Sequence, residues 1–128
     1  MDILIVEDDD TILSTYIELI EDLGLEYLHC RNSKEIMSLI SNMPQFKIGI
    51  FDINIGCEPL DGKTLLKTMR LKGFQFTPII ISGMISSTDI SNFCEENIKY
   101  VIRKPANPLL LSNLLKELSG KFNESVKA

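Results

Sequence analysis

The strongest constraint on the fold is the alternation of short apolar runs with longer segments of helical periodicity. The apolar runs lie at Ile3–Val6, Leu25–His29, Lys47–Phe51, Pro78–Ser82 and Lys99–Arg103. Between these runs, apolar residues recur three or four positions apart, as they do on one face of an α-helix. Regular alternation of strands and helices predicts a parallel sheet covered by helices on both faces.

Boundary signals support the expected helices. Asn32 and Glu35 have the spacing of a capping box, and the helix that they begin is expected to end at Pro44. The pair Asn107–Pro108 supplies an N-cap and a first-turn proline for the last helix, which should extend to about Leu118.

Together these elements predict an α/β fold. Right-handed crossovers between parallel strands lead to a doubly wound topology. We therefore expect a five-stranded parallel sheet with helices on both faces. The chain of 128 residues suits one domain, expected at residues 1–119, with 120–128 as a C-terminal tail or the start of a linker.

Composition narrows the class of protein. The net charge is -5 and no basic run is present, so direct binding to nucleic acid is not expected. The apolar runs are too short to span a membrane, and Asp2 lies where a signal peptide would be basic. Cys30, Cys57 and Cys94 form neither a disulfide framework nor a CxxC metal site. We expect a cytoplasmic protein with reduced thiols.

Polar residues stand at the ends of the predicted strands. Glu7 and Asp8 follow the first strand, Asp52 follows the third, Ser82 ends the fourth and Lys104 follows the fifth. In a doubly wound sheet these ends meet at one edge, where such proteins bind their ligands. Converging carboxylates repel each other unless a cation joins them, and oxygen ligands suit Mg²⁺.

Each of these residues also has a simpler interpretation. The acidic run Glu7–Asp10 could be a solvated helix start, where negative charge interacts favourably with the helix N-terminus. Asp52 could begin a turn, Ser82 could belong to one, and Lys104 could be a surface residue. The simpler explanations become much less probable when all of these residues occur together at successive strand ends.

The ordered set of motifs resembles the response-regulator receiver domain of two-component signalling, the CheY-like family. The motifs are ILIVED with the acidic pair, IFDIN with Asp52, IIISG with Ser82 and VIRKP with Lys104. The resemblance extends from Asp2 to about Leu118. It implies a flavodoxin-like sheet of order 2-1-3-4-5, which specifies the doubly wound fold that the periodicity predicts.

The resemblance also implies roles for the reacting residues. Asp52 would accept a phosphoryl group from a phosphohistidine on a sensor histidine kinase or a histidine phosphotransfer protein. Lys104 would pair with one phosphoryl oxygen, and Ser82 would hydrogen-bond another after the domain switches. Pro105 would follow a cis peptide bond. The chain would not be an enzyme beyond its own phosphoryl transfer and autodephosphorylation.

A magnesium site follows from the same resemblance. Asp8 and Asp52 would bind Mg²⁺ directly, together with the backbone carbonyl of Asn54. Glu7 would hold a water molecule bound to the metal. Phosphoryl transfer needs the charge of the equatorial oxygens to be neutralised, which Mg²⁺ and Lys104 would do.

The sequence departs from the family pattern at three places. Gly56 stands where a proline is usual, and the loop after Asp52 is about two residues longer than usual. Val101, next to Tyr100, replaces the usual aromatic residue three positions before the lysine. Met84 replaces a residue that lines the path of the hydrolytic water, and slow autodephosphorylation is expected from its apolar side chain.

Two other functions compete with a phosphorylatable receiver. A haloacid-dehalogenase-type phosphohydrolase also uses a strand-end aspartate, but it needs a second aspartate two residues later, where this chain has Asn54. A degenerate receiver would bind partners without phosphorylation, and the complete set of strand-end residues argues against it.

The output is expected on the face formed by Ser86–Leu118, either as a homodimer contact or as an effector interface. On the last helix, Leu111 and Leu115 should pack on the sheet, whereas Leu109 should be exposed. The sequence is compatible with a single-domain regulator and with a fragment that precedes an effector domain, and it leaves the cognate kinase open.

Overall fold

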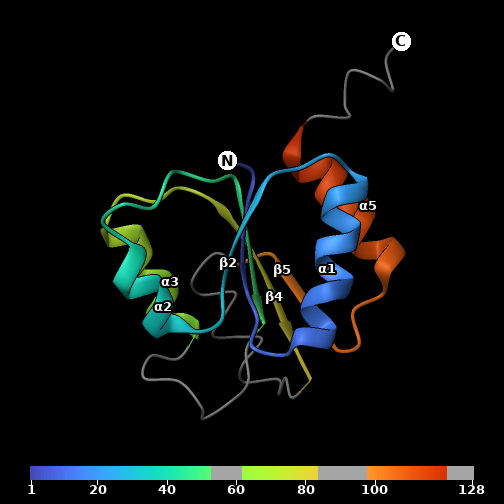
Figure 1. The fold of residues 1–128 in the computed structure, drawn as a ribbon, viewed down its shortest axis with the longest axis horizontal. Coiled ribbons are helices and arrows are strands. Elements are labelled where there is room, and N and C mark those ends of the chain that lie inside the picture. The colour runs from blue at the N-terminus through green and yellow to red at the C-terminus, as the bar shows by residue number, and fades with distance from the viewer. Residues whose placement is uncertain (53–61, 84–97, 121–128) are drawn as a thin grey trace.

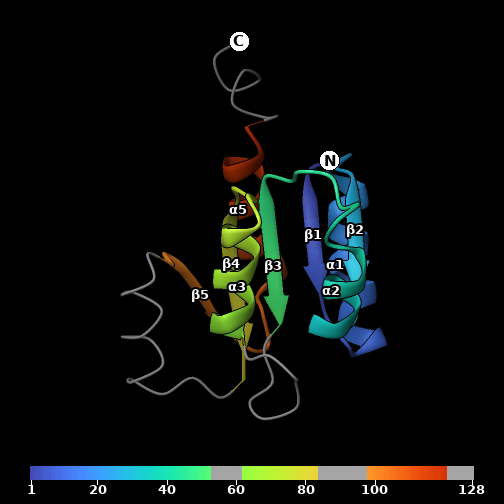
Figure 2. The same ribbon diagram turned by 90° about the vertical axis from the view of Figure 1, so that its left-hand side faces the viewer.

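The computed structural model describes residues 1–52, 62–83 and 98–120. Within these ranges it contains a five-stranded parallel sheet of order β2-β1-β3-β4-β5, as predicted. Figure 2 shows the strands in this order, with β5 and β2 at the two edges. The strands are β1 (Ile3–Val6), β2 (Tyr27–Cys30), β3 (Ile48–Asp52), β4 (Thr77–Ser82) and β5 (Tyr100–Arg103).

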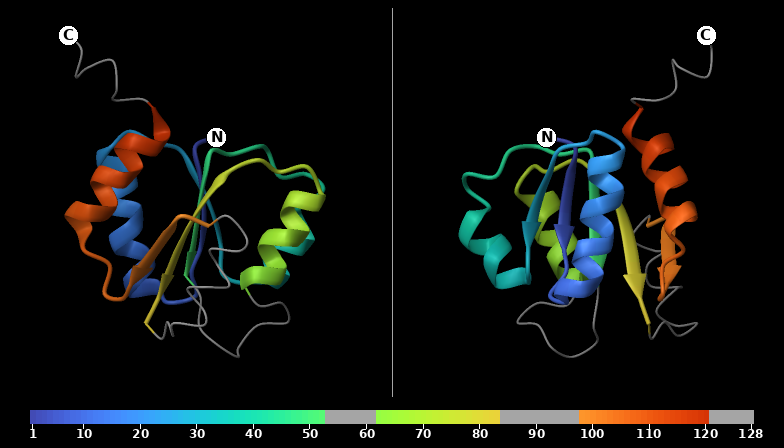
Figure 3. Two further views of the ribbon diagram at one scale, coloured as in Figure 1. Left: turned by 180° about the vertical axis from the view of Figure 1, so that it is seen from behind. Right: turned by 45° about the vertical axis from the view of Figure 1, so that its right-hand side comes forward.

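Helices cover both faces of the sheet (Figure 1). The described helices are α1 (Asp10–Asp22), α2 (Ser33–Leu39), α3 (Gly62–Leu71) and α5 (Pro108–Ser119). Helices α1 and α5 lie side by side on one face, and α2 and α3 lie on the other, as the two views in Figure 3 also show. None of the helices in the described ranges is long and apolar enough to cross a membrane.

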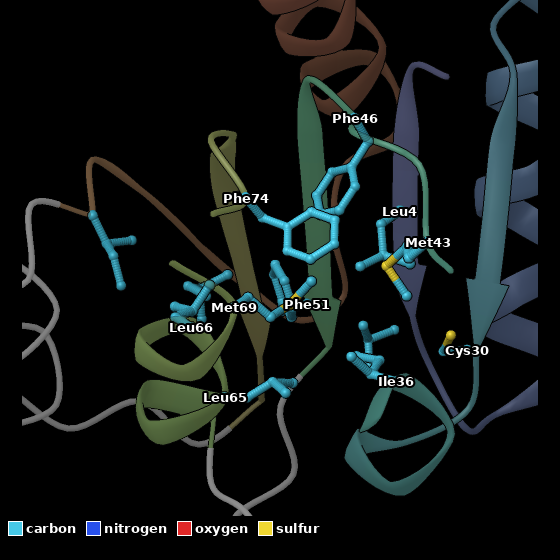
Figure 4. Packing of buried hydrophobic residues seen from close by; sticks show 13 residues of the cluster. Leu4, Cys30, Ile36, Met43, Phe46, Phe51, Leu65, Leu66, Met69 and Phe74 are labelled. Carbon is cyan, nitrogen blue, oxygen red and sulfur yellow. The ribbon is translucent and has the colours of Figure 1, made fainter. Parts of the chain in front are cut away.

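Each face of the sheet has its own apolar core because strand residues point alternately to the two sides. The α1–α5 core contains Ile3, Ile5, Tyr16, Ile20, Leu25, Ile48, Ile50, Ile79, Ile81, Leu111 and Leu115. The α2–α3 core contains Leu4, Val6, Cys30, Ile36, Met43, Phe46, Phe51, Leu65, Leu66, Met69, Phe74, Ile80 and Ile98 (Figure 4). The central strands are therefore buried on both sides.

Aromatic packing in the α2–α3 core explains a glycine inside a strand. The ring centroids of Phe51 and Phe76 lie 5.8 Å apart, and Phe46 lies 4.7 Å from Phe76. A Cβ atom at Gly49 would lie 2.5 Å from Cε2 of Phe51 and 3.1 Å from Cδ2 of Phe76. Glycine thus provides space for rings that fill the core.

Two boundaries differ from the sequence prediction by more than one residue. Helix α2 ends at Leu39 and not at Pro44. The chain turns there, with the Asn42 amide donating to the Leu39 carbonyl at 2.9 Å, and the turn brings Met43 into the α2–α3 core. Strand β2 begins at Tyr27 and not at Leu25, whose amide instead donates to the Ile20 carbonyl.

The register brings the carboxyl ends of the strands together at the lower edge of the sheet in Figures 1 and 2. Val6 pairs with Phe51, and Asp52 pairs with Ile81. Ser82, the next residue of β4, pairs with Arg103. The residue that follows β1 is therefore placed next to Asp52, and the residue that follows β5 lies at the same edge one strand further along.

Candidate functional site

Asp52 lies at the centre of this edge, at the end of β3. Its side chain is fully buried, and it contacts two groups from distant parts of the chain. Lys104 Nζ lies 2.5 Å from Asp52 Oδ1, which makes an ion pair. The Tyr16 hydroxyl donates to Asp52 Oδ2 at 3.5 Å. The peptide bond between Lys104 and Pro105 is cis, as predicted.

Glu7 supplies a second buried carboxyl group. It follows β1 directly and is 1% exposed. Its amide donates to the Cys30 carbonyl at 3.1 Å, and its own carbonyl lies 2.8 Å from His29 Nε2. The Asp9 amide donates to Glu7 Oε1 at 2.8 Å, whereas Oε2 has no hydrogen-bond partner in the described part of the chain.

Burial of Glu7 and Asp52 side by side controls the electrostatics of the site. Burial, and secondly the neighbouring Asp52 carboxyl group, raise the pKa of Glu7 to about 8 from its ordinary value of 4.5. Burial and the charges of Asp52 and Glu7 also raise the pKa of the Tyr16 hydroxyl. Two carboxyl groups therefore share a buried site with the ammonium group of Lys104.

A small hard cation fits this donor set. The unpartnered Oε2 of Glu7 is a hard oxygen donor in a site where negative charge is costly, and oxygen donors of this kind suit Mg²⁺. Asp8, the neighbour of Glu7, is exposed. In the described ranges, no three Asp, Glu, His or Cys side chains are already grouped as a metal-binding cluster. Glu7 and Asp52 are thus brought together, while the expected direct role of Asp8 stays a prediction.

The remaining acids of the first run have the structural role that the simpler interpretation gave them. Asp9 is the N-cap of α1, where Oδ1 accepts from the amides of Thr11 at 2.9 Å and Ile12 at 3.0 Å. Asp10 begins the helix and pairs with Arg31 at 2.9 Å. A second nitrogen of Arg31 donates to the Asp8 carbonyl at 2.9 Å. Part of the acidic run therefore caps a helix, and only Glu7 enters the buried site.

Ser82 lies at the end of β4, next to the strand end that carries Asp52. Gly83 follows it and lies against the stem of Lys104, because a Cβ atom there would be 3.8 Å from Lys104 Cβ. Asn54, Gly56 and Met84 lie outside the described residues, as do residues 86–97 of the face expected to carry the output.

The sequence prediction missed two residues of this edge. The helical spacing of Tyr16 shows that it faces the sheet but not that its hydroxyl reaches the end of β3. Arg31 has a recognisable signal, because it is a cation directly after a strand that neighbours an acidic strand end. Val101 and Tyr100 are both half-buried, on the α2–α3 and α1–α5 sides respectively.

Comparison with known proteins agrees with this arrangement. A search of curated proteins gives no match. Among solved structures, a CheY-like response regulator receiver domain protein from Methanospirillum hungatei JF-1 is similar at 27% identity, with a TM-score of 0.76 and coverage of 98% of this chain and 96% of that one. A response regulator receiver domain protein from Clostridium thermocellum has 22% identity, a TM-score of 0.77 and coverage of 99% and 98%.

A third similar structure is the receiver domain of a signal transduction histidine kinase from Syntrophus aciditrophicus. It has 23% identity, a TM-score of 0.73 and coverage of 95% of this chain and 92% of that one. The sequence also matches the family model described as response regulator receiver domain over residues 3–116. The chain belongs to the response regulator receiver domain family of two-component signalling.

Proposed function

We propose that Asp52 accepts a phosphoryl group from a phosphohistidine on a sensor histidine kinase or a histidine phosphotransfer protein. The observation that carries this proposal is the buried Asp52 carboxylate at the strand-end edge, in contact with Lys104 and next to Glu7. Family membership supports the same role. In the transfer, one Asp52 oxygen forms a bond to phosphorus as the bond from phosphorus to the histidine nitrogen breaks. The electron pair of that bond leaves with the imidazole.

Lys104 has two successive tasks in this proposal. Before transfer, its ammonium group compensates the charge of the Asp52 carboxylate at 2.5 Å. During transfer, negative charge spreads over the phosphoryl oxygens, and the flexible lysine side chain can follow it. After transfer, the partner of Lys104 is thus the phosphoryl group in place of the Asp52 carboxylate.

The same edge would hold Mg²⁺ through Asp8 and Asp52, the backbone carbonyl of Asn54 and a water molecule held by Glu7. When bound, Mg²⁺ supplies positive charge that stabilises the phosphoryl oxygens during transfer. The buried, unpartnered Oε2 of Glu7 supports a cation at this position.

Phosphorylation would also change the surface. An acyl phosphate adds charge and strong hydrogen-bond acceptors, and Ser82 would donate to one of its oxygens in the switched state. The contact with a second copy or an effector would then form on the Ser86–Leu118 face. In the described part of that face, Leu109 is 69% exposed, as the sequence predicted.

The experiment is phosphorylation by acetyl phosphate with Mg²⁺, followed by intact mass measurement. Wild type should gain one phosphoryl group, and Asp52→Asn should gain none. Asp10→Asn is the matched control because Asp10 is an exposed acid of the same edge that pairs with Arg31. A chelator should abolish the adduct in wild type and in Asp10→Asn. An adduct that persists in Asp52→Asn would contradict the assignment of Asp52.

Two further assays, beryllofluoride binding and phosphomonoester hydrolysis, separate the competing functions. A degenerate receiver would take up neither acetyl phosphate nor beryllofluoride in the presence of Mg²⁺. A phosphohydrolase of the haloacid-dehalogenase type would release inorganic phosphate from many phosphomonoesters with turnover. The proposed receiver should instead accumulate a single acyl phosphate that decays slowly.

A further inference from the structure

The hydroxyl group of Tyr16 has a position that packing alone does not explain. Tyr16 lies on α1 and is 4% exposed, so its hydroxyl must find its hydrogen-bond partner inside the protein. That partner is Asp52 Oδ2, at 3.5 Å. The other oxygen of the same carboxyl group faces Lys104. The two oxygens of the phosphoacceptor are therefore in different surroundings.

These surroundings differ in how easily they can change. Lys104 is a long side chain that is partly exposed, so it can move from Oδ1 to an incoming phosphoryl group. The Tyr16 ring is fixed in the α1–α5 core, and its hydroxyl cannot leave Oδ2 without repacking that core. Oδ1 is thus the oxygen that can be freed for reaction, and Oδ2 is the one that stays held.

We propose that Tyr16 is a positioning residue for the phosphoacceptor: its hydroxyl holds Oδ2, leaves Oδ1 to carry the phosphoryl group, and shortens the lifetime of the acyl phosphate. This inference rests on the proposed function of Asp52. It assigns to α1 a part in setting how long the phosphorylated state lasts.

The effect on lifetime follows from the charge of the acceptor. In the acyl phosphate, Oδ2 is a neutral carbonyl oxygen. On hydrolysis, a water oxygen forms a bond to phosphorus, the bond from phosphorus to Oδ1 breaks, and the electron pair remains on Asp52 while the water proton goes to phosphate or solvent. The negative charge spreads over both carboxylate oxygens, so the hydrogen bond from Tyr16 strengthens as the bond breaks.

The test is Tyr16→Phe, which removes the hydroxyl and keeps the ring. We expect autodephosphorylation to slow by roughly three- to tenfold, because one hydrogen bond that strengthens in the transition state is lost. The matched control is Tyr27→Phe, since Tyr27 also packs against the α1–α5 core but begins β2. Decay is followed by intact mass after removal of acetyl phosphate. An unchanged lifetime in Tyr16→Phe, or an equal change in Tyr27→Phe, would overturn the proposal.

A spectroscopic measurement makes the result independent of phosphorylation. The chain has 3 tyrosines and no tryptophan, so its ultraviolet emission comes from tyrosine. A hydrogen bond to a carboxylate quenches tyrosine emission. Asp52→Asn should therefore raise the emission of the protein with Tyr16 but leave that of Tyr16→Phe unchanged.

The two measurements distinguish failure of this inference from failure of the proposed function. If wild type takes up no phosphoryl group, the proposed function and the lifetime role both fail, while the emission result still decides whether Tyr16 holds Oδ2. If wild type is phosphorylated but Asp52→Asn changes emission equally with and without Tyr16, the positioning role is wrong and the phosphoacceptor stands.

Discussion

Glu7 is the residue whose surroundings are least favourable to its ordinary charge. It is almost fully buried, one of its oxygens has no partner in the described ranges, and the Asp52 carboxyl group lies close by. A carboxyl group in such a position is retained at a cost unless a proton or a cation compensates it. The stability of the fold therefore depends on whether Glu7 is compensated by a proton or by a cation.

This link predicts a pH dependence of stability in the presence of a chelator. The pKa of Glu7 is about 8 in the folded protein and 4.5 ordinarily, so the folded state binds this proton more tightly than the unfolded chain does. Stability should consequently fall as the pH rises from about 4.5 to 8. Melting temperatures of wild type and Glu7→Gln across this window measure the effect, and Glu7→Gln should have the flatter profile.

The control is Glu18→Gln, because Glu18 is an exposed carboxyl group on α1. It should keep the wild-type pH profile. Saturating Mg²⁺ should reduce the loss of wild-type stability at high pH if the cation takes the place of the proton. A Glu7→Gln profile as steep as that of wild type would show that other groups control the transition.

The polar residues at the ends of the predicted strands indicated part of the site, and the reason is geometric. The ends of parallel strands must meet at one edge, so Asp52, Glu7 and Lys104 could be placed together without knowing any side-chain contact. Tyr16 could not be placed in this way. Helical periodicity indicates which face of α1 is buried, but the reach of a long side chain to Asp52 depends on how far along the sheet the helix sits.

At the scale of elements, α5 has one side buried against the sheet and another exposed to solvent. Asn107 caps it by accepting from the amides of Leu109 at 2.9 Å and Leu110 at 3.2 Å. Leu111 and Leu115 are buried in the α1–α5 core, as the sequence predicted, whereas Leu109 and Leu110 are exposed. Helix boundaries were harder to predict: Pro44 sets an outer limit to α2, but the turn after Leu39 depends on the packing of Met43.

The two sides of α5 should differ sharply in their effect on stability. Leu115→Ala removes a fully buried side chain and should lower the free energy of unfolding by about 2–5 kcal/mol. Leu109→Ala should change it by less than about 0.5 kcal/mol, because this side chain is largely exposed. Urea unfolding of both variants measures the difference. Equal effects would mean that Leu109 is covered by another part of the protein.

At the scale of the whole molecule, the topology could be predicted completely and the output could not. Alternating elements and right-handed crossovers, which are general properties of chains, predict a doubly wound parallel sheet, and the resemblance to receiver domains adds the strand order. A partner surface depends instead on which apolar side chains remain uncovered after folding. Here the short segment from Lys104 to Asn107 joins the site to the exposed start of α5. A movement of Lys104 during phosphorylation would therefore act directly on the segment that precedes Leu109.

This connection leads to a prediction about assembly. Leu109→Asp should leave Asp52 phosphorylation and folding intact but weaken association of the phosphorylated protein, because it places a charge in an exposed apolar position. Leu71→Asp is the matched control, since Leu71 is 88% exposed but ends α3, which packs on the opposite face of the sheet. Sedimentation velocity with and without beryllofluoride compares the three proteins. We expect beryllofluoride to promote self-association of wild type and Leu71→Asp only. If Leu109→Asp assembles like wild type, or Leu71→Asp loses association equally, the contact does not lie at the start of α5. If wild type stays monomeric, a homodimer on this face is wrong and an effector is left as its partner.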